Sequence, residues 1–271
     1  IFSSVYGVVE EVKEDRIVIR PDEEQPDEYE KISEGTPLEM VKEAGVVGMD
    51  GAGFPTGIKL DAHLDHGYIL INAAECEPGL YHNIRQIEAE SDKIVRGVKY
   101  CMDIAGADKA IFAIKKKNEK AVETLRTAIK DEEAMTIHLL PDIYPMGEER
   151  AVVRECLGVN LTTTQLPSAA RSVVVNLETA AKVAEAIDER KPCISKNMTV
   201  RGKLNGGNGA HVFMDVPIGV SVGEMIEKAG GIDGVYGEII MGGAFTGKST
   251  DLDAPTTKTT GGILVTGEFP D

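Results

Sequence analysis

The segment from Gly48 to Lys59 (GMDGAGFPTGIK) combines closely spaced glycines with a lysine. Glycines at this density let successive backbone N–H groups point inward, which makes a cradle for an anion such as a phosphate. The lysine side chain is near enough to reach a phosphate held there. The segment is not a dinucleotide fingerprint, because Thr56 stands where a third glycine is required and no strand pattern precedes it. A purely structural turn is the alternative interpretation.

A second segment with chemical potential is NAAECEPG, residues 72–79, which begins within the apolar run YILINA at 68–73. Ligands of open α/β sheets lie beyond the carboxyl ends of the strands, so Glu75 and Glu77 are better placed to contact a ligand than acids on a helix face. Ordinary exposed loop acids are the alternative. Cys76 is the thiol within this segment, and packing against a ligand is favoured over a redox role.

Two further segments follow the same logic. YPMGEER, at 144–150, comes after another strand pattern, and VVNLET, at 174–179, opens a helix pattern. Asn176 in the latter is either a helix N-cap or a ligand contact.

Other motifs are weaker. GGAFTGKS at 242–249 fits the P-loop expression, but the following residues TDLDAPTT are poor helix formers broken by proline, so nucleotide hydrolysis is not expected. The cluster Asp61, His63, Asp65 and His66 matches no common zinc spacing, and we interpret it as a solvated turn. The four cysteines form no C-x-x-C pair, which argues against a zinc finger or an internal iron–sulfur cluster.

The elements that position these segments alternate between strand and helix. Strands are predicted over 68–73, 110–114 and 136–140, and helices over 84–104, 117–130 and 175–188. Such alternation predicts a sheet with helices packed on its faces. A further helix is predicted to begin at Thr36, since Glu39 completes a capping box, and to stop at Gly45.

Three regions follow from these patterns. Residues 1–32 contain a predicted β-hairpin over 5–20, a candidate remnant of a barrel-sandwich domain, and 33–190 form the α/β domain. Residues 191–271 contain strands at 197–203, 210–214 and 238–241 and a helix at 221–229, which suggests a β-grasp-like domain.

Composition sets the outer limits. The 271 residues carry a net charge of −16, which argues against nucleic acid or an anionic membrane as the main partner. No apolar run approaches the roughly 18 residues of a membrane-spanning helix, and no secretory signal is visible, so a cytoplasmic location is expected. The missing initiator methionine suggests processing or a longer protein.

The four segments, in this order, resemble the FMN- and NADH-binding subunit of respiratory complex I, and still more closely the C subunit of the Rnf electron-transport complex. The resemblance covers about 37–190. Residues 215–263 resemble the soluble-ligand-binding β-grasp (SLBB) domain of both families. The stretch GGAFTGKSTDLDAPTTKTTGGILV is similar to the proline reductase-associated electron-transfer protein (PrdC), a relative of the Rnf subunit.

This resemblance implies a Rossmann-like, three-layer domain for FMN and NADH, followed by an SLBB-like β-grasp domain. It also implies site residues in four groups. They are Gly48, Gly51, Ala52, Gly53 and Lys59 for the phosphate and ribityl chain; Asn72, Glu75 and Cys76 along the flavin ring; Gly147, Glu148, Glu149, Asn176 and Thr179 completing the pocket; and Phe54 and Glu77, with Glu149, near the nicotinamide nucleotide. No side chain is expected to act as a nucleophile, and no metal ligand is expected.

The implied function is electron transfer from NADH through FMN to a partner redox protein, for which a proline reductase system is a candidate. Two residues depart from the family patterns: Ala74 replaces an aspartate of the complex I pattern, and Glu148 replaces a glycine usual in Rnf-like chains. A ferredoxin module is also missing from the sequence. The alternative is therefore a cofactor-free module that docks onto a larger redox complex.

Overall fold

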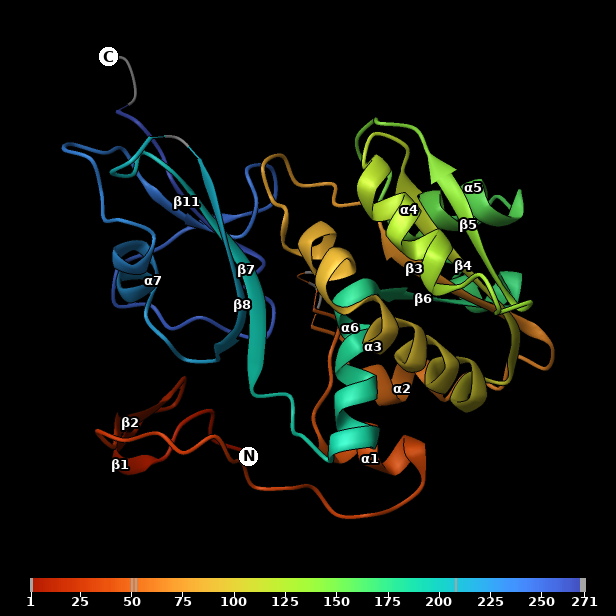
Figure 1. The fold of residues 1–271 in the computed structure, drawn as a ribbon, viewed down its shortest axis with the longest axis horizontal. Coiled ribbons are helices and arrows are strands. Elements are labelled where there is room, and N and C mark those ends of the chain that lie inside the picture. Colours follow the sequence, from red (N-terminus) through yellow and green to blue (C-terminus); the bar gives the residue numbers. More distant parts are fainter. Residues whose placement is uncertain (1, 50, 52, 208, 269–271) are drawn as a thin grey trace.

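The computed structural model describes residues 2–49, 51, 53–207 and 209–268. A four-stranded parallel sheet with helices packed against it forms the first structural unit (Figure 1). Its strands, in the spatial order β5-β4-β3-β6, are β3 (Gly67–Ala73), β4 (Ala107–Lys115), β5 (Met135–Leu140) and β6 (Ser172–Asn176). Strand β3, one of the two inner strands, is a nearly continuous apolar run because helices cover both of its faces.

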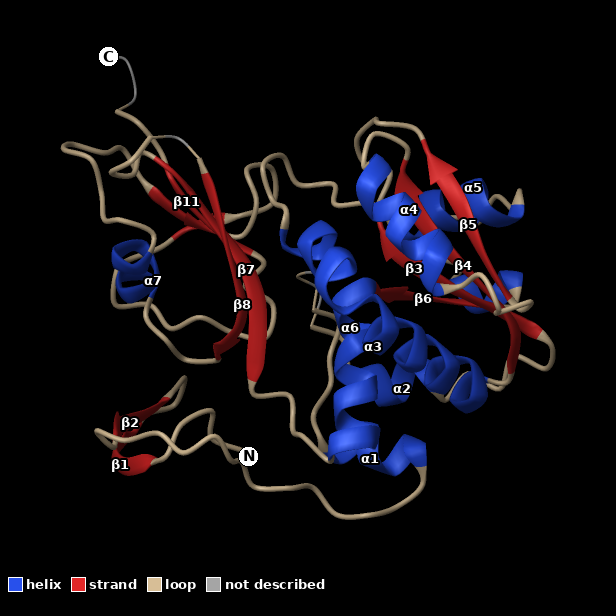
Figure 2. Cartoon of the chain, viewed as in Figure 1, coloured by secondary structure: helices blue, strands red, loops and turns tan. Residues whose placement is uncertain are grey.

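Successive side chains of β3 point to opposite faces of the sheet, and each face has its own core. Ile69 and Ile71 belong to the large cluster formed with α3 (His82–Ala105) and α6 (Leu177–Ala184). Leu70 belongs to a smaller cluster with residues of α5 (Glu149–Leu157). Figure 2 shows the helices distributed around the strands in this way. The predicted three-layer α/β arrangement is confirmed.

The shorter helices complete this unit. They are α1 (Pro37–Glu43), α2 (Thr56–Leu60) and α4 (Glu119–Ala128). At the start of α1 the Thr36 hydroxyl accepts from the Glu39 amide at 3.3 Å, and the Glu39 carboxylate accepts from the Thr36 amide at 2.8 Å. Gly45 follows with φ +67°, a left-handed conformation that ends the helix. The predicted start and stop are both confirmed.

A second, mixed sheet of five strands lies beside the first unit (Figure 1). Its order is β10 (Lys248–Ser249), β9 (Ile239–Met241), β11 (Gly262–Val265), β7 (Ser195–Gly202) and β8 (Ala210–Pro217). Strand β11 is parallel to β7, and the other pairs are antiparallel. Helix α7 (Val222–Lys228) buries Val222 and Met225 against this sheet. A separate hairpin pairs β1 (Gly7–Val12) with β2 (Ile17–Pro21).

The predicted helix over 175–188 was wrong at its beginning. Residues 172–176 form β6, the fourth parallel strand, and α6 begins only at Leu177. The run of three β-branched valines is buried in the sheet, which favours the strand. A π-helical turn, Glu185–Glu189, extends the end of α6. None of the helices in the described part of the chain has the length and apolar character needed to cross a membrane.

Candidate cofactor site at the carboxyl ends of the parallel strands

The carboxyl ends of β3 and β6 carry Asn72 and Asn176, which are register partners on neighbouring parallel strands. Both line a hollow of about 330 Å³, here called the larger hollow. Its other lining residues come from four segments: Gly51; Glu75, Cys76, Glu77, Leu80, His82 and Asn83; Tyr144, Pro145, Gly147 and Glu148; and Gly242, Gly243, Thr246, Thr259 and Gly261. Most of the residues predicted from separate stretches of sequence are thus brought together.

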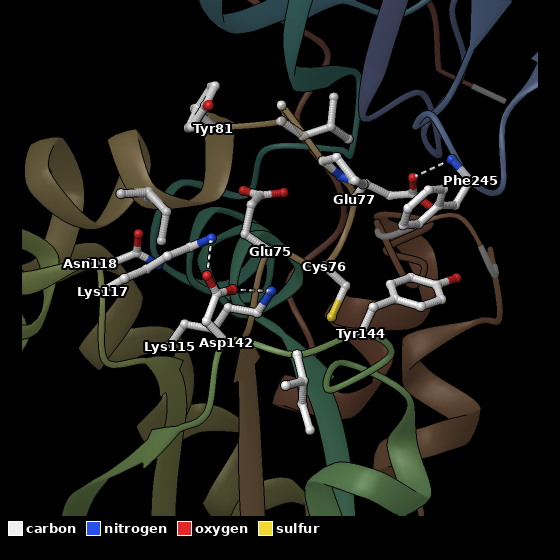
Figure 3. Close-up of a pocket in the computed structure, with 15 residues that line it drawn as sticks. Glu75, Cys76, Glu77, Tyr81, Lys115, Lys117, Asn118, Asp142, Tyr144 and Phe245 are labelled. Atoms are coloured by element: carbon white, nitrogen blue, oxygen red, sulfur yellow. Dashed lines mark hydrogen bonds and ion pairs between the residues drawn. The ribbon is translucent and has the colours of Figure 1, made fainter.

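A second hollow of about 260 Å³, the smaller hollow, adjoins the first (Figure 3). Glu75, Cys76, Glu77, Leu80 and Tyr144 line both. The smaller hollow adds residues from four places: Pro78, Gly79, Tyr81 and Ile84, between β3 and the start of α3; Lys115, Lys117 and Asn118, at the end of β4; Asp142 and Ile143, after β5; and Phe245, from a loop of the second sheet. None of these residues was predicted as a site residue, although Pro78 and Gly79 belong to the segment 72–79. Lys115, Lys117 and Asn118 follow a predicted strand, so the strand-end rule indicates them as well.

Hydrogen bonds tie the end of β3 to the segment before α5. The Asn72 side-chain amide donates to the Gly147 carbonyl at 2.9 Å, and the Gly147 amide donates to Cys76 Sγ at 2.7 Å. A Cβ atom at position 147 would lie 2.7 Å from that sulfur, so any larger residue would force the two segments apart. Glycine is therefore required where this wall of the larger hollow closes.

The glycine loop closes on itself. The Gly48 amide donates to the Phe54 carbonyl at 2.9 Å, and the Gly53 amide donates to the Gly48 carbonyl at 3.1 Å. The Met49 amide donates to Thr179 Oγ1 at 3.0 Å. The predicted cradle of successive amides facing a phosphate is therefore wrong for Gly48 and Gly53, because these donors are already used inside the protein.

Gly51, with φ +104°, is the described residue of this loop that lines the larger hollow. Ala52 lies outside the described residues. Lys59, also from the predicted phosphate group, forms an ion pair with Glu149. Lys59, Glu149 and Phe54 line neither hollow as the structure describes them, and the Phe54 side chain is exposed.

The start of α6 holds the glycine loop in place. Asn176 Oδ1 accepts hydrogen bonds from the amides of Glu178, at 2.9 Å, and Thr179, at 3.2 Å, so it caps the helix. The Thr179 hydroxyl, besides accepting from Met49, donates to the Val47 carbonyl at 3.3 Å. Asn176 thus both caps α6 and lines the larger hollow. Thr179 positions the glycine loop through its two hydrogen bonds with the backbone of Val47 and Met49.

Glu148 performs a similar structural task at the next helix. Its carboxylate accepts from the amides of Arg150 and Ala151, at 3.1 and 3.2 Å, which caps α5. A carboxylate also suits this end of a helix because the helix dipole is positive there. Glu148 lines the larger hollow from this position.

Burial controls the acid–base properties of Glu75 and Cys76, which line both hollows. Glu75 has a left-handed backbone, φ +42°, and its carboxylate accepts from the Asn83 amide at 3.0 Å. Loss of solvent raises the pKa of Glu75 from its ordinary value to about 7. Burial also raises the pKa of the neighbouring Cys76 thiol. At neutral pH the carboxyl group of Glu75 is therefore partly protonated, and it lies beside the protonated thiol of Cys76.

Glu77 does not point freely toward a ligand. One carboxylate oxygen accepts from the Phe245 backbone amide at 2.9 Å (Figure 3). The other accepts from Thr246 Oγ1 at 2.5 Å. These two partners lie between β9 and β10 of the second sheet. Both sheets therefore contribute to the walls of the two hollows.

Comparison with known proteins agrees with this arrangement. Residues 41–185 match the family model described as the Nuo51 FMN-binding domain. The cobalamin reductase PduS of Salmonella typhimurium is 38% identical over 228 residues, covering 84% of this chain and 49% of the relative. The C subunit of the Na(+)-translocating ferredoxin:NAD(+) oxidoreductase complex of Acetobacterium woodii is 31% identical, covering 83% of this chain and 51% of the relative. The chain spans about half the length of the curated relatives it matches.

Among solved structures, an air-oxidized NAD+-reducing NiFe hydrogenase superposes with a TM-score of 0.67 at 23% identity. The superposition covers 84% of this chain and 46% of the hydrogenase chain. At this identity the likeness concerns the fold. The sequence-based relationship to the complex I subunit and to the C subunits of ion-translocating redox complexes is confirmed by these matches.

Proposed function

The chain belongs to the family described as the Nuo51 FMN-binding domain, and from that premise we propose that it binds FMN in the larger hollow. The observation that carries the proposal is the pair Asn72 and Asn176, placed side by side at the carboxyl ends of two parallel strands. This edge is where open α/β sheets bind their ligands. Both residues fall within the matched range 41–185.

The donor set of the larger hollow suits a planar cofactor with a polar tail. The side-chain NH2 groups of Asn72 and Asn176 supply donors, while their Oδ1 atoms accept from backbone amides of the protein. The open space at Gly51 admits close approach of a ligand to the backbone. Tyr144 adds an aromatic surface. A binding site for a flavin needs these features together, namely a narrow slot, fixed polar groups and an apolar wall.

We assign Asn72, Glu75 and Cys76 to the ring of FMN, and Gly51 of the glycine loop, with Lys59, to its phosphate. When bound, FMN supplies hydride acceptance and single-electron transfer. The side chains of this protein bind and orient it and keep water away. Lys59 must exchange Glu149 for the phosphate in order to take part.

We further propose that NADH is the nucleotide substrate and that a separate redox protein exchanges electrons with the flavin. The relatives support both points, since they include a subunit of a ferredoxin:NAD(+) oxidoreductase complex and a cobalamin reductase. The similarity of residues 242–265 to the proline reductase-associated protein supports a proline reductase system as that partner. Residues 191–271 are proposed as an SLBB-like domain, and residues 33–190 as the cofactor domain.

The test begins with the purified chain and added FMN. We expect retained yellow absorbance, quenched flavin fluorescence, and bleaching when NADH is added without oxygen. Gly147→Val should abolish retention, because its side chain would occupy the space next to Cys76, while Gly209→Ala, in open space, should not. A folded wild-type protein that retains no FMN would overturn the proposal and would favour the cofactor-free docking module.

A further inference from the structure

The connection between β9 and β10, residues 242–247, reaches from the second sheet into the site. Gly242, Gly243 and Thr246 line the larger hollow, and Phe245 lines the smaller one. We call this segment the bridging loop. It contains the GGAFTG part of the motif whose sequence fits the P-loop expression. The two-residue strand β10, Lys248–Ser249, follows it, where a P-loop would be followed by a helix.

Glu77 fastens the bridging loop to the parallel-sheet unit. Its carboxylate accepts from both the Phe245 amide, at 2.9 Å, and the Thr246 hydroxyl, at 2.5 Å. A Cβ atom on Gly243 would lie 2.0 Å from the Glu77 carboxylate, so only glycine permits this approach. Hydrogen bonds to an ionised acceptor are stronger than neutral ones, and two of them fix both the position and the orientation of the loop.

The loop fixed in this way presents an aromatic ring to a second one. The rings of Phe245 and Tyr144 meet edge to face, with centroids 4.8 Å apart and planes at 74° (Figure 3). Both side chains remain largely exposed, 60% for Phe245 and 50% for Tyr144. Tyr144 lines both hollows. An exposed aromatic pair at the mouth of a hollow leaves apolar ring surface that a ligand would cover.

We propose that Phe245 and Tyr144 form an aromatic wall that contacts the planar heteroaromatic ring of a bound ligand, and that Glu77 is the positioning residue that holds this wall in place. The inference rests on the proposed function and deepens it. Two rings share the required chemistry, the isoalloxazine of FMN and the nicotinamide of NADH. Stacking against aromatic side chains is favourable for either, since both present flat π faces.

The chain contains no tryptophan, so a tryptophan introduced at position 245 is a specific reporter. We expect the emission of Phe245→Trp to be quenched on titration with FMN, or, if the wall serves nicotinamide, only when NAD+ is added to FMN-loaded protein. Tyr236→Trp provides the control, because Tyr236 is a partly exposed aromatic of the same sheet unit and lines neither hollow. Its emission should change little in either titration.

The role of Glu77 is tested by two substitutions. Glu77→Ala removes both hydrogen bonds. We expect the ligand that quenches the Phe245→Trp emission to bind this variant about tenfold more weakly. Glu77→Gln retains an acceptor for the Phe245 amide and a partner for the Thr246 hydroxyl, so it should restore most of that loss. If the negative charge of Glu77 itself contacts the ligand, Glu77→Gln will be as weak as Glu77→Ala, which would overturn the positioning role.

The outcomes separate the two proposals. Failure of the wild-type chain to bind FMN would contradict the proposed function. Normal binding of FMN and NAD+ with unquenched Phe245→Trp emission would contradict the aromatic wall alone. Circular dichroism melting of each variant checks that the substitution has not unfolded the chain.

Discussion

The ammonium group of Lys196, on β7, forms an ion pair with the carboxylate of Glu178, on α6, and both side chains are buried, with 0% and 1% exposure. Lys196 also donates to the Asn197 carbonyl at 2.6 Å, and the Asn197 amide donates to the second carboxylate oxygen of Glu178 at 2.7 Å. The pair thus joins the helix layer of the parallel sheet to the second sheet.

Removing the cation should therefore destabilise the whole chain. Lys196→Met leaves Glu178 buried without a counter-charge, and such losses cost about 3–5 kcal/mol. We expect the free energy of unfolding, measured by urea titration, to fall by this amount. The double variant Lys196→Met/Glu178→Gln should recover part of it, because no isolated charge then remains buried.

An exposed ion pair supplies the control. Lys228 and Glu224, on α7, are 3.5 Å apart, and each side chain is 55% exposed. Exposed pairs of this kind contribute about 0.3–0.5 kcal/mol, so Lys228→Met should be nearly neutral. Equal effects of the two lysine substitutions would contradict the structural importance of the buried pair.

Gly97 provides a second stability prediction, in which two effects oppose each other. In the middle of α3, alanine is favoured over glycine by about 1 kcal/mol of helix propensity. A Cβ atom at this position would lie 1.8 Å from the Ala180 carbonyl oxygen on α6, and a backbone atom of a packed helix cannot easily move away. Overpacking costs about 1–3 kcal/mol or more, so Gly97→Ala should lower the melting temperature. Gly209→Ala, with open space around it, should not.

Local patterns predicted the framework of the site, because periodicity and caps are properties of short segments. The alternation of strands and helices and the capping box at Thr36 follow from residues close together in sequence. The general rule that ligands lie beyond the carboxyl ends of parallel strands then indicated the segment that begins at Asn72. Strand β6 was not predicted, because only Asn176 separates its three valines from the helix that begins at Leu177, and the apolar residues of the two elements form one run.

Contacts between distant residues could not be predicted in this way. Glu77 finds its partners in a loop that begins at Gly242, and Lys196, on a strand of the second sheet, pairs with Glu178 on a helix of the parallel-sheet unit. The amides of Gly48 and Gly53 donate to carbonyl groups within the glycine loop. The spacing of glycines alone does not determine how such a loop closes. These features arise from tertiary packing, and they decide which polar groups remain available to a ligand.

The raised pKa of Glu75 makes a prediction about stability and pH. Its folded pKa of about 7 exceeds its ordinary value of 4.5 because burial disfavours the charge. The folded chain therefore keeps a proton that the unfolded chain releases, and this contribution to stability, present below pH 4.5, is lost as the pH rises to 7. Glu75→Gln is neutral at every pH. Relative to wild type, it should gain at most about 2–3 kcal/mol in unfolding free energy between pH 5 and pH 8.

The same titrations with Glu123→Gln, on the exposed face of α4, control for the general loss of a negative charge. If wild type and Glu75→Gln keep a constant difference from pH 5 to pH 8, burial does not raise the Glu75 pKa.

Lys59 and Glu149 should affect FMN binding in opposite directions. The two side chains pair with each other, at 29% and 42% exposure, so each variant should remain folded. If Lys59 neutralises the phosphate, Lys59→Met should weaken FMN binding by about tenfold. Glu149→Gln should strengthen it, because it frees the lysine. Fluorescence titration measures both constants, and a parallel weakening in the two variants would show that the pair acts only by shaping the loop.

Protection of cysteines offers a test of where FMN binds. Cys76 lines both hollows, while Cys156, on α5, is partly buried outside them, and burial raises the pKa of both thiols, that of Cys156 to about 12. Both should therefore react slowly with a maleimide at pH 8, since the thiolate is the reactive form. FMN should slow labelling of Cys76 in proportion to the fraction of protein that has bound it, and should leave the rate at Cys156 unchanged. Mass spectrometry of the peptides gives both rates from one sample, so that Cys156 serves as the internal control. Labelling of Cys76 at an unchanged rate in FMN-saturated protein would place the cofactor elsewhere, even if the protein remained yellow.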